Sequence, residues 1–218
     1  MSLRYTLDSH ALAFDPASAL NLMCPHFMEK DRLAAFSDGV IAIIITIMVL
    51  DLKTPTGAAF SDLERLTPDF LSYALSFLYV AIYWNNHHHM LQTVKNVNGI
   101  ILWSNTHLLF WLSLVPFATR WLGEDYLATI PTAIYGMVLL LCGIAYYLLQ
   151  RAIICSQGKQ SLLRKAVGRD WKGILSIVSY CAAILLSFAQ PVAANAIYAF
   201  VALMWLIPDQ RIERIMRK

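Results

Sequence analysis

Residues 33–52 read LAAFSDGVIAIIITIMVLDL, an apolar run in which Asp38 is the only ionisable group away from the end. About 20 apolar residues are enough for a helix to cross the hydrocarbon core of a bilayer. Lys30-Asp31-Arg32 precede the run and Lys53-Thr54-Pro55 follow it. We therefore predict a first membrane-spanning helix here and an integral membrane protein for the chain as a whole.

The rest of the chain supports this class. It is 58% hydrophobic and 14% charged over 218 residues, whereas a soluble domain is about 25% charged. Further apolar segments predict spans at 70–90, 99–122 and 127–149. The charge-free stretch 173–207 would be about 50 Å long as one helix, against a core of about 30 Å. We predict two short spans there, joined by a tight hairpin at Gln190-Pro191.

The predicted fold is an all-α integral membrane protein with six transmembrane helices per subunit and both ends in the cytoplasm. In this topology the 17 Lys and Arg residues divide fourteen inside to three outside, a strong positive-inside bias. The predicted domains are a cytoplasmic N-terminal tail at 1–29, a six-helix membrane domain at 30–210 and a basic cytoplasmic C-terminal tail at 211–218.

The first predicted helix has two faces. At about 100° per residue, Thr46, Ile47 and Leu50 all lie within about 60° of Ile43, so the four form one stripe. Asp38 lies about 140° from Ile43, nearly on the opposite face. A stripe of this kind can pack against other helices or line a pore, and helical geometry alone leaves both open.

Asp38 calls for a partner, because a carboxylate inside a membrane is costly unless it is paired or hydrated. A place near cytoplasmic water is the simpler alternative, since Asp38 lies close to the start of the span. The face opposite the stripe points Asp38 toward neighbouring helices. Four intramembrane candidates for its partner are His87, His88, Asn105 and His107.

The stretch from Arg32 to Ile43, with Arg32 followed by Phe36-Ser37-Asp38, resembles the opening helix of the transmembrane protein 175 family of potassium channels. Further similarities follow in order: Trp84, Asn86-His87-His88, Asn105 and Pro116-Phe117. The resemblance covers roughly 30–125 by motif. The letters of 58–62 repeat Ala-Ala-Phe-Ser-Asp, but Leu63-Glu64-Arg65 follow, and we expect a loop there rather than a second unit.

The resemblance implies a pore lined by the first helices of four six-span units. One unit per chain then implies a homotetramer in the cell membrane, in contact with membrane lipids. The family's apolar constriction corresponds here to Ile43, Ile47 and Leu50, with a polar layer at Thr46. The resemblance also implies a structural polar network that ties the first helix to the second and third. Its expected members are Arg32, Phe36, Ser37, Asp38, His87 and Asn105.

The predicted function is passive conduction of potassium ions. The sequence has no TVGYG-like segment whose carbonyls could replace the hydration shell of the ion. The apolar side chains of Ile43, Ile47 and Leu50 from four subunits must then form the constriction themselves. Such an apolar ring can gate by dewetting. A proton-coupled secondary transporter that uses Asp38 and His87 is the alternative. Transporters usually show internal repeats and broken spans, and no clear repeat is present, which favours the channel.

Other chemistry has little support in the sequence. No Ser-His-Asp constellation or P-loop indicates an enzyme, and nothing indicates nucleic-acid binding or a cofactor. Consecutive residues such as His87-His88-His89 point about 100° apart on a helix, so we expect no metal site. The basic residues at 151–172 can fix the topology or bind anionic lipid headgroups. These residues are Arg151, Lys159, Arg164, Lys165, Arg169 and Lys172.

Overall fold

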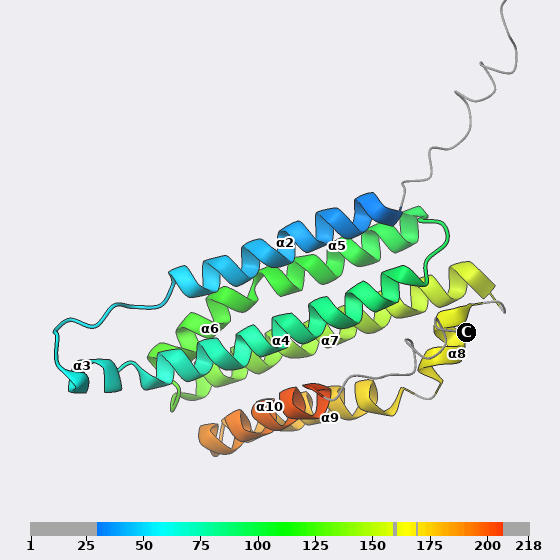
Figure 1. Ribbon diagram of the computed structural model, residues 1–218. Coiled ribbons are helices and arrows are strands. Elements are labelled where there is room, and N and C mark those ends of the chain that lie inside the picture. Colours follow the sequence, from blue (N-terminus) through cyan, green and yellow to red (C-terminus); the bar gives the residue numbers. More distant parts are fainter. Residues whose placement is uncertain (1–29, 159–160, 169, 207–218) are drawn as a thin grey trace, which may run out of the picture.

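The computed structural model describes residues 30–158, 161–168 and 170–206, and all regular structure in these ranges is helical (Figure 1). The predicted tails at 1–29 and 211–218 lie outside the described residues. The helices are α2 (Lys30–Leu50), α3 (Phe60–Glu64), α4 (Thr67–Gln92), α5 (Gly99–Ser113), α6 (Val115–Glu124), α7 (Thr129–Gln157), α8 (Leu162–Val167), α9 (Trp171–Ser187) and α10 (Pro191–Leu206).

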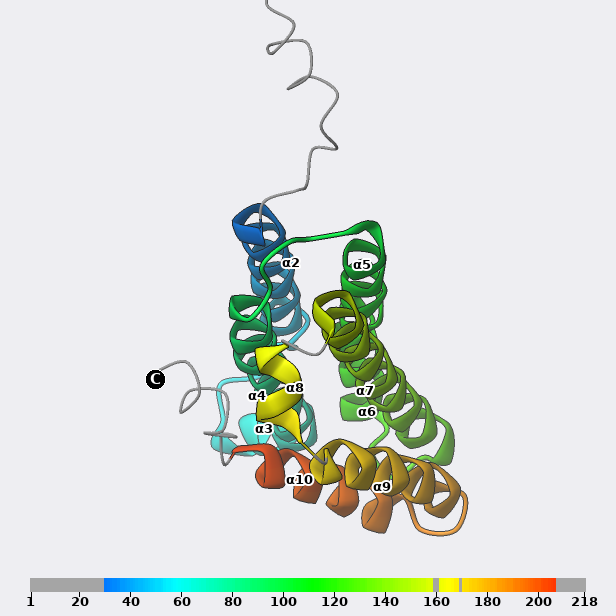
Figure 2. The same ribbon diagram turned by 90° about the vertical axis from the view of Figure 1, so that its right-hand side faces the viewer.

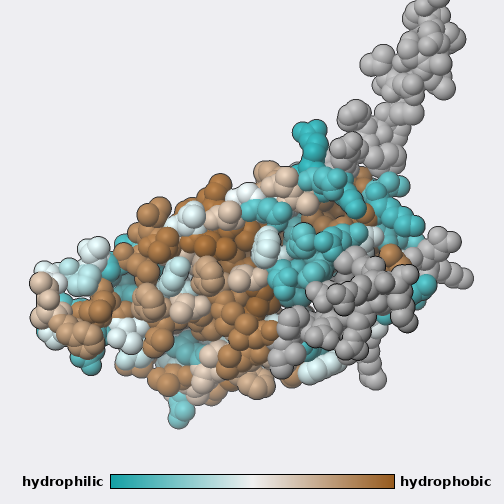
Figure 3. Space-filling view, viewed as in Figure 1, coloured by the Kyte–Doolittle hydropathy of each residue, from teal (hydrophilic) through white to brown (hydrophobic). Residues whose placement is uncertain are grey.

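Within the described residues, three segments are long and apolar enough to cross a membrane: α2, α5 together with α6, and α7. The apolar helices α9 and α10 are shorter, with 17 and 16 residues. Helix α4 has 26 residues but carries a polar run from Asn85 to His89 near its end. In Figure 3 apolar residues cover most of the visible surface, and hydrophilic ones gather at the end of the bundle where α2 begins. The chain is a multi-pass membrane protein.

Prolines mark two of the helix boundaries. Pro116 lies in the first turn of α6, directly after the break at Leu114 that separates α6 from α5. Pro191 begins α10, and only three residues separate it from the end of α9, which is the hairpin that the sequence predicts. Proline lacks a backbone N–H and is tolerated only in the first turn of a helix without disrupting it. The expected loop at 58–62 differs, because Phe60–Glu64 forms one short helix.

The long helices run roughly alongside one another (Figures 1 and 2). Helix α7 packs against α5, α6 and α9, and α10 packs against α9 and α4. Helix α2 packs against α4, α5 and α6. In the end-on view of Figure 2, α9 and α10 lie at one side of the bundle and α2 at the other. Helix α2 therefore lies at an edge and keeps one side uncovered.

Hydroxyl groups bind one another in the interior, where no water can serve as partner. Thr119 donates to Ser76 at 2.7 Å, and Ser76 shares a hydrogen bond of 2.9 Å with Tyr135. Tyr79 donates to the carbonyl of Tyr198 at 2.6 Å. These bonds join α4 to α6, α7 and α10, so the polar groups of the core also position its helices.

Candidate functional site

The stripe of Ile43, Thr46, Ile47 and Leu50 lies on the uncovered face of α2. The exposed fractions of Ile43, Ile47 and Leu50 are 59%, 43% and 81% in the single chain. Thr46 is exposed as well, and its hydroxyl donates to the carbonyl of Ile43 at 2.8 Å. The threonine hydroxyl is thus satisfied by its own helix, and none of the four stripe residues belongs to the buried core of the subunit.

The other face of α2 is buried against the bundle. Leu33, Ile41, Ile44 and Met48 are each at most 3% exposed. In the most apolar 18-residue stretch of α2, only 28% of the residues are buried within the chain. The corresponding shares are 39% for α5 with α6 and 50% for α7. Among the three long apolar segments, α2 therefore has the largest share of surface available to a partner outside the subunit.

Ser37, Asn105 and His87 form a buried hydrogen-bond chain across three helices. The Asn105 amide on α5 donates to the Ser37 hydroxyl on α2 at 2.9 Å. The His87 Nε2 on α4 lies 2.7 Å from the Asn105 Oδ1 and donates to it in this arrangement. Ser37 in turn donates to the carbonyl of Leu33 at 2.8 Å. All three side chains are at most 1% exposed, so this chain fixes how α2 lies on α4 and α5.

Asp38 has a different partner from the four that the sequence suggests. Its Oδ1 accepts a hydrogen bond of 2.9 Å from the indole Nε1 of Trp84 on α4. His88 stacks on Trp84, with ring centroids 6.0 Å apart. Trp84 lies three residues before His87, one turn along the same helix. Asp38 lies away from the stripe, and the packing of α4 against α2 makes Trp84 the residue that meets it.

Two residues of the predicted polar network, Arg32 and Phe36, lie outside the hydrogen-bond chain of Ser37, Asn105 and His87. Arg32 is exposed and pairs with no residue in the described part of the chain. Phe36 is 60% exposed and, seven residues before Ile43, lies on the same face of α2 as the stripe. The structure thus brings Ser37, His87 and Asn105 together, whereas Phe36 extends the uncovered apolar surface.

Ion pairs hold the opposite end of α2. Lys53, just after the helix, lies 2.8 Å from Glu124 at the end of α6, and Arg120 lies 3.6 Å from Asp51. The hydrogen bond to Glu124 raises the pKa of the Lys53 ammonium above its ordinary value. These groups are substantially exposed, so each pair is weak by itself. Together they join the C-terminal end of α2 to α6.

Comparison with known proteins matches this arrangement to one family. The family model described as endosomal/lysosomal potassium channel TMEM175 matches residues 32–116, which contain nearly all of α2 together with α4 and α5. A potassium channel of Chryseobacterium sp. (strain P1-3) is 53% identical over 191 residues, which cover 88% of this chain and 100% of that relative. The chain belongs to the TMEM175 family.

The fold of this TMEM175-family chain also matches a solved structure. The crystal structure of a lysosomal potassium-selective channel TMEM175 homolog from Chamaesiphon minutus superimposes with a TM-score of 0.74 at 25% identity. The match covers 83% of this chain and 97% of that one. The endosomal/lysosomal proton channel TMEM175 of Homo sapiens is 31% identical over 103 residues, but these cover only 20% of the human protein. The chain therefore matches the two bacterial potassium channels along nearly their whole length, but only a fifth of the longer animal protein.

Proposed function

We propose that this TMEM175-family chain is one subunit of a homotetrameric potassium channel of the cell membrane, with a pore lined by α2 of each subunit. The observation that carries the proposal is the stripe of Ile43, Thr46, Ile47 and Leu50, which lies uncovered on α2 while the opposite face is buried. Potassium follows from the names of the relatives that match along most of their length.

Four such stripes facing one axis would form an apolar throat. From Ile43 to Leu50 the stripe is about 10 Å long, at 1.5 Å per residue. Isoleucine and leucine offer no ligands to an ion, so a permeating cation must keep most of its water or the ring must widen. Potassium holds its water less tightly than sodium, which favours potassium, and a ring this apolar can close by dewetting. The Thr46 side chains would interrupt the apolar wall halfway.

The proton-coupled transporter alternative requires Asp38 and His87 to exchange a proton. Asp38 binds Trp84, and His87 binds Asn105. Within the described residues no hydrogen bond joins Asp38 to His87 directly. The arrangement therefore supports a structural role for both side chains and leaves the pore to the opposite face of α2.

Planar-bilayer recordings of the purified protein test the function. With a potassium gradient across the bilayer and sodium balancing the ionic strength, we expect currents that reverse near the equilibrium potential of potassium. A pH gradient in symmetric potassium measures any proton current separately. A silent bilayer, combined with saturable transport that Asp38→Asn abolishes, would replace the channel with a carrier.

Substitutions on α2 test the pore surface. Ile43→Asn and Ile47→Asn should each raise the unitary conductance and lower the preference for potassium over sodium, because a polar ring wets more easily. Val49→Asn is the matched control: Val49 is 47% exposed, but lies about 120° from Ile43 on the helix. If Val49→Asn changes conduction as much as Ile47→Asn does, the assignment of the stripe is wrong.

Subunit number is tested by native mass spectrometry of the protein in detergent. We expect a mass of four chains. In a variant that lacks the natural cysteines, Leu50→Cys should form disulfides that join the subunits in pairs, because the α2 ends meet at the axis. A monomer, or a tetramer in which Leu50→Cys never forms a bond, contradicts the proposed arrangement.

A further inference from the structure

A cavity of about 650 Å³ lies among α4, α7 and α9, away from the α2 stripe. Its volume is in the range of small-molecule sites, about 300–1,000 Å³. We propose that this cavity binds one anionic phospholipid, with the phosphate at Arg151 and Arg164 and the glycerol and upper acyl chains among the tyrosines. The site is independent of the pore and of the proposed ion.

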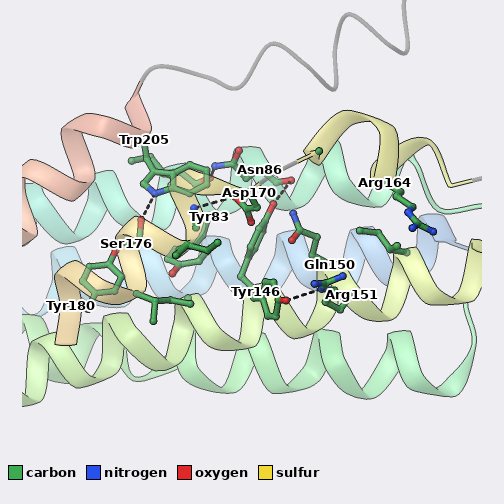
Figure 4. A pocket seen from close by; sticks show the side chains of 18 of the residues that line it. Tyr83, Asn86, Tyr146, Gln150, Arg151, Arg164, Asp170, Ser176, Tyr180 and Trp205 are labelled. Carbon is green, nitrogen blue, oxygen red and sulfur yellow. Dashed lines mark hydrogen bonds between the residues drawn. The ribbon is translucent and has the colours of Figure 1, made fainter. Parts of the chain in front are cut away.

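The walls come from three membrane helices (Figure 4). Tyr83 of α4 and Tyr146 of α7 pack edge to face, with ring centroids 6.0 Å apart, and both line the cavity. Tyr180 of α9 lies deeper, and Gly143 of α7 leaves room because it has no side chain. At the mouth, the indole of Trp205 on α10 donates to Ser176 at 2.8 Å. Tyrosine and tryptophan prefer the boundary between water and lipid, where one end of the ring is apolar and the other is wet.

Positive charge is concentrated at one end of the cavity. Arg151 lies over the ring of Tyr147 at 5.2 Å and donates from Nε to its hydroxyl at 2.8 Å, which fixes the guanidinium and leaves its terminal N–H groups available. Arg164 of α8 lines the same end. In the described part of the chain neither arginine forms an ion pair with a carboxylate. The one acid in the described lining, Asp170, caps α9 by accepting from the N–H of Gly173 at 3.0 Å.

Gln150 indicates that the cavity holds a polar ligand. Its side chain is only 5% exposed and lines the cavity from α7, and Figure 4 shows it directed into the space between α7 and α4. No described residue forms a hydrogen bond with its amide. The amide can be reached from the cavity, so it is available to a polar group of a bound ligand. The ester or phosphate oxygens of a phospholipid can accept from this amide.

The cavity is amphiphilic, which favours a lipid over a soluble anion. Its arginines lie at the end of the bundle where the sequence predicts the cytoplasmic membrane surface, and its deeper part is lined by aromatic and aliphatic groups of the spans. Beside the mouth, Ile174, Val178 and Leu185 form an uncovered apolar stripe along α9, with exposed fractions of 59%, 58% and 74%. An acyl chain that leaves the cavity can follow this stripe toward the bilayer centre. A free phosphate would use only the arginines.

Native mass spectrometry of the detergent-purified full-length protein measures lipid binding directly. We expect one phosphatidylglycerol per subunit to bind more tightly than phosphatidylcholine with the same acyl chains. Arg151→Gln and Arg164→Gln should each weaken phosphatidylglycerol binding about fivefold. Lys165→Gln is the matched control, because Lys165 lies next to Arg164 on α8 but outside the cavity lining. Equal losses for Lys165→Gln and Arg164→Gln would mean that surface charge alone attracts the lipid, and would overturn the proposal.

A steric variant tests the cavity without a change of charge. A Cβ at Gly143 would lie 3.8 Å from both Tyr180 and Tyr83, an ordinary contact. Gly143→Ala should therefore keep the lipid, whereas Gly143→Leu should fill the space and reduce binding at least tenfold. If Gly143→Leu fails to fold, Gln150→Leu replaces it, with a smaller loss expected. Inorganic phosphate at a hundredfold excess should leave the lipid bound; full displacement by phosphate would show a soluble-anion site and contradict the lipid.

Discussion

Replacing Asn105 by alanine should loosen α2 from the bundle. Asn105 is completely buried and bonds to Ser37 and His87 at 2.9 and 2.7 Å. Ser37 keeps its bond to the Leu33 carbonyl, but His87 loses the partner of its Nε2. An unsatisfied buried group costs about 1–3 kcal/mol, and hydrogen bonds between membrane helices average about 0.6 kcal/mol each. We therefore expect a loss of about 2 kcal/mol in the free energy of unfolding.

Thermal unfolding in detergent, followed by tryptophan fluorescence, measures this loss. For a chain of this size about 2 kcal/mol corresponds to a decrease in Tm of about 4–8 °C. Asn96→Ala is the control, because Asn96 is exposed in the α4–α5 loop and surface changes usually stay within about 0.5 kcal/mol. Ser37→Ala combined with Asn105→Ala should cost less than the sum of the two single changes, since both remove the same bond.

Two results would refute this reasoning. One is a Tm for Asn105→Ala that lies within about 1 °C of the parent protein, which would mean that the buried chain contributes almost nothing. The other is strict additivity of Ser37→Ala and Asn105→Ala, which would mean that the two side chains do not interact. In either case the buried chain through Asn105 would not be what fixes α2 on α4 and α5.

Three further predictions concern other contacts. Trp84→Phe removes the donor to Asp38 and should lower Tm more than Asp38→Asn, which keeps an acceptor at the same place; equal effects would contradict the bond. Lys53→Glu places like charges beside Glu124 and should lower Tm at low salt, and adding Glu124→Lys should recover part of the loss; no recovery would rule out direct pairing. Gly136→Ala brings a Cβ against the Tyr198 hydroxyl and within 2.9 Å of Ile184. This overpacking should lower the free energy of unfolding by about 1–3 kcal/mol, measured as a lower Tm. Gly143→Ala, whose Cβ has ordinary contacts, should leave Tm nearly unchanged.

The helices were predictable because each depends on local chemistry. Apolar length identifies α2 and α7, and Pro116 and Pro191 mark breaks that a missing backbone N–H makes unavoidable. The single turn of α3 was missed because its Ala59-Phe60-Ser61-Asp62 letters lack an apolar continuation. Its signal was Asp62, whose carboxylate accepts from the N–H of Ala59 at 3.2 Å.

Contacts between helices were harder to predict. Helical periodicity places Asp38 opposite Ile43, but the depth and rotation of α4 decide whether Trp84 or His87 meets it, and these depend on packing between all the spans. The same applies to the cavity beside Gly143. Its residues come from separate helices between Tyr79 and Trp205, so their juxtaposition follows only from the tertiary structure.

The attachments of α2 bear on its role more than its exposure does. An apolar face turned outward is ordinary in a membrane, because lipid covers it as well as a pore or another helix would. However, α2 is held near its start by the buried chain through Asn105 and just beyond its end by Lys53 and Arg120. The stripe from Ile43 to Leu50 lies between these two attachments. A helix face that contacts only lipid needs no fixed position. In a pore constriction about as wide as a partly hydrated ion, by contrast, a small displacement of the helix changes the conductance. Attachment at both ends therefore favours the pore over lipid as the environment of this stripe.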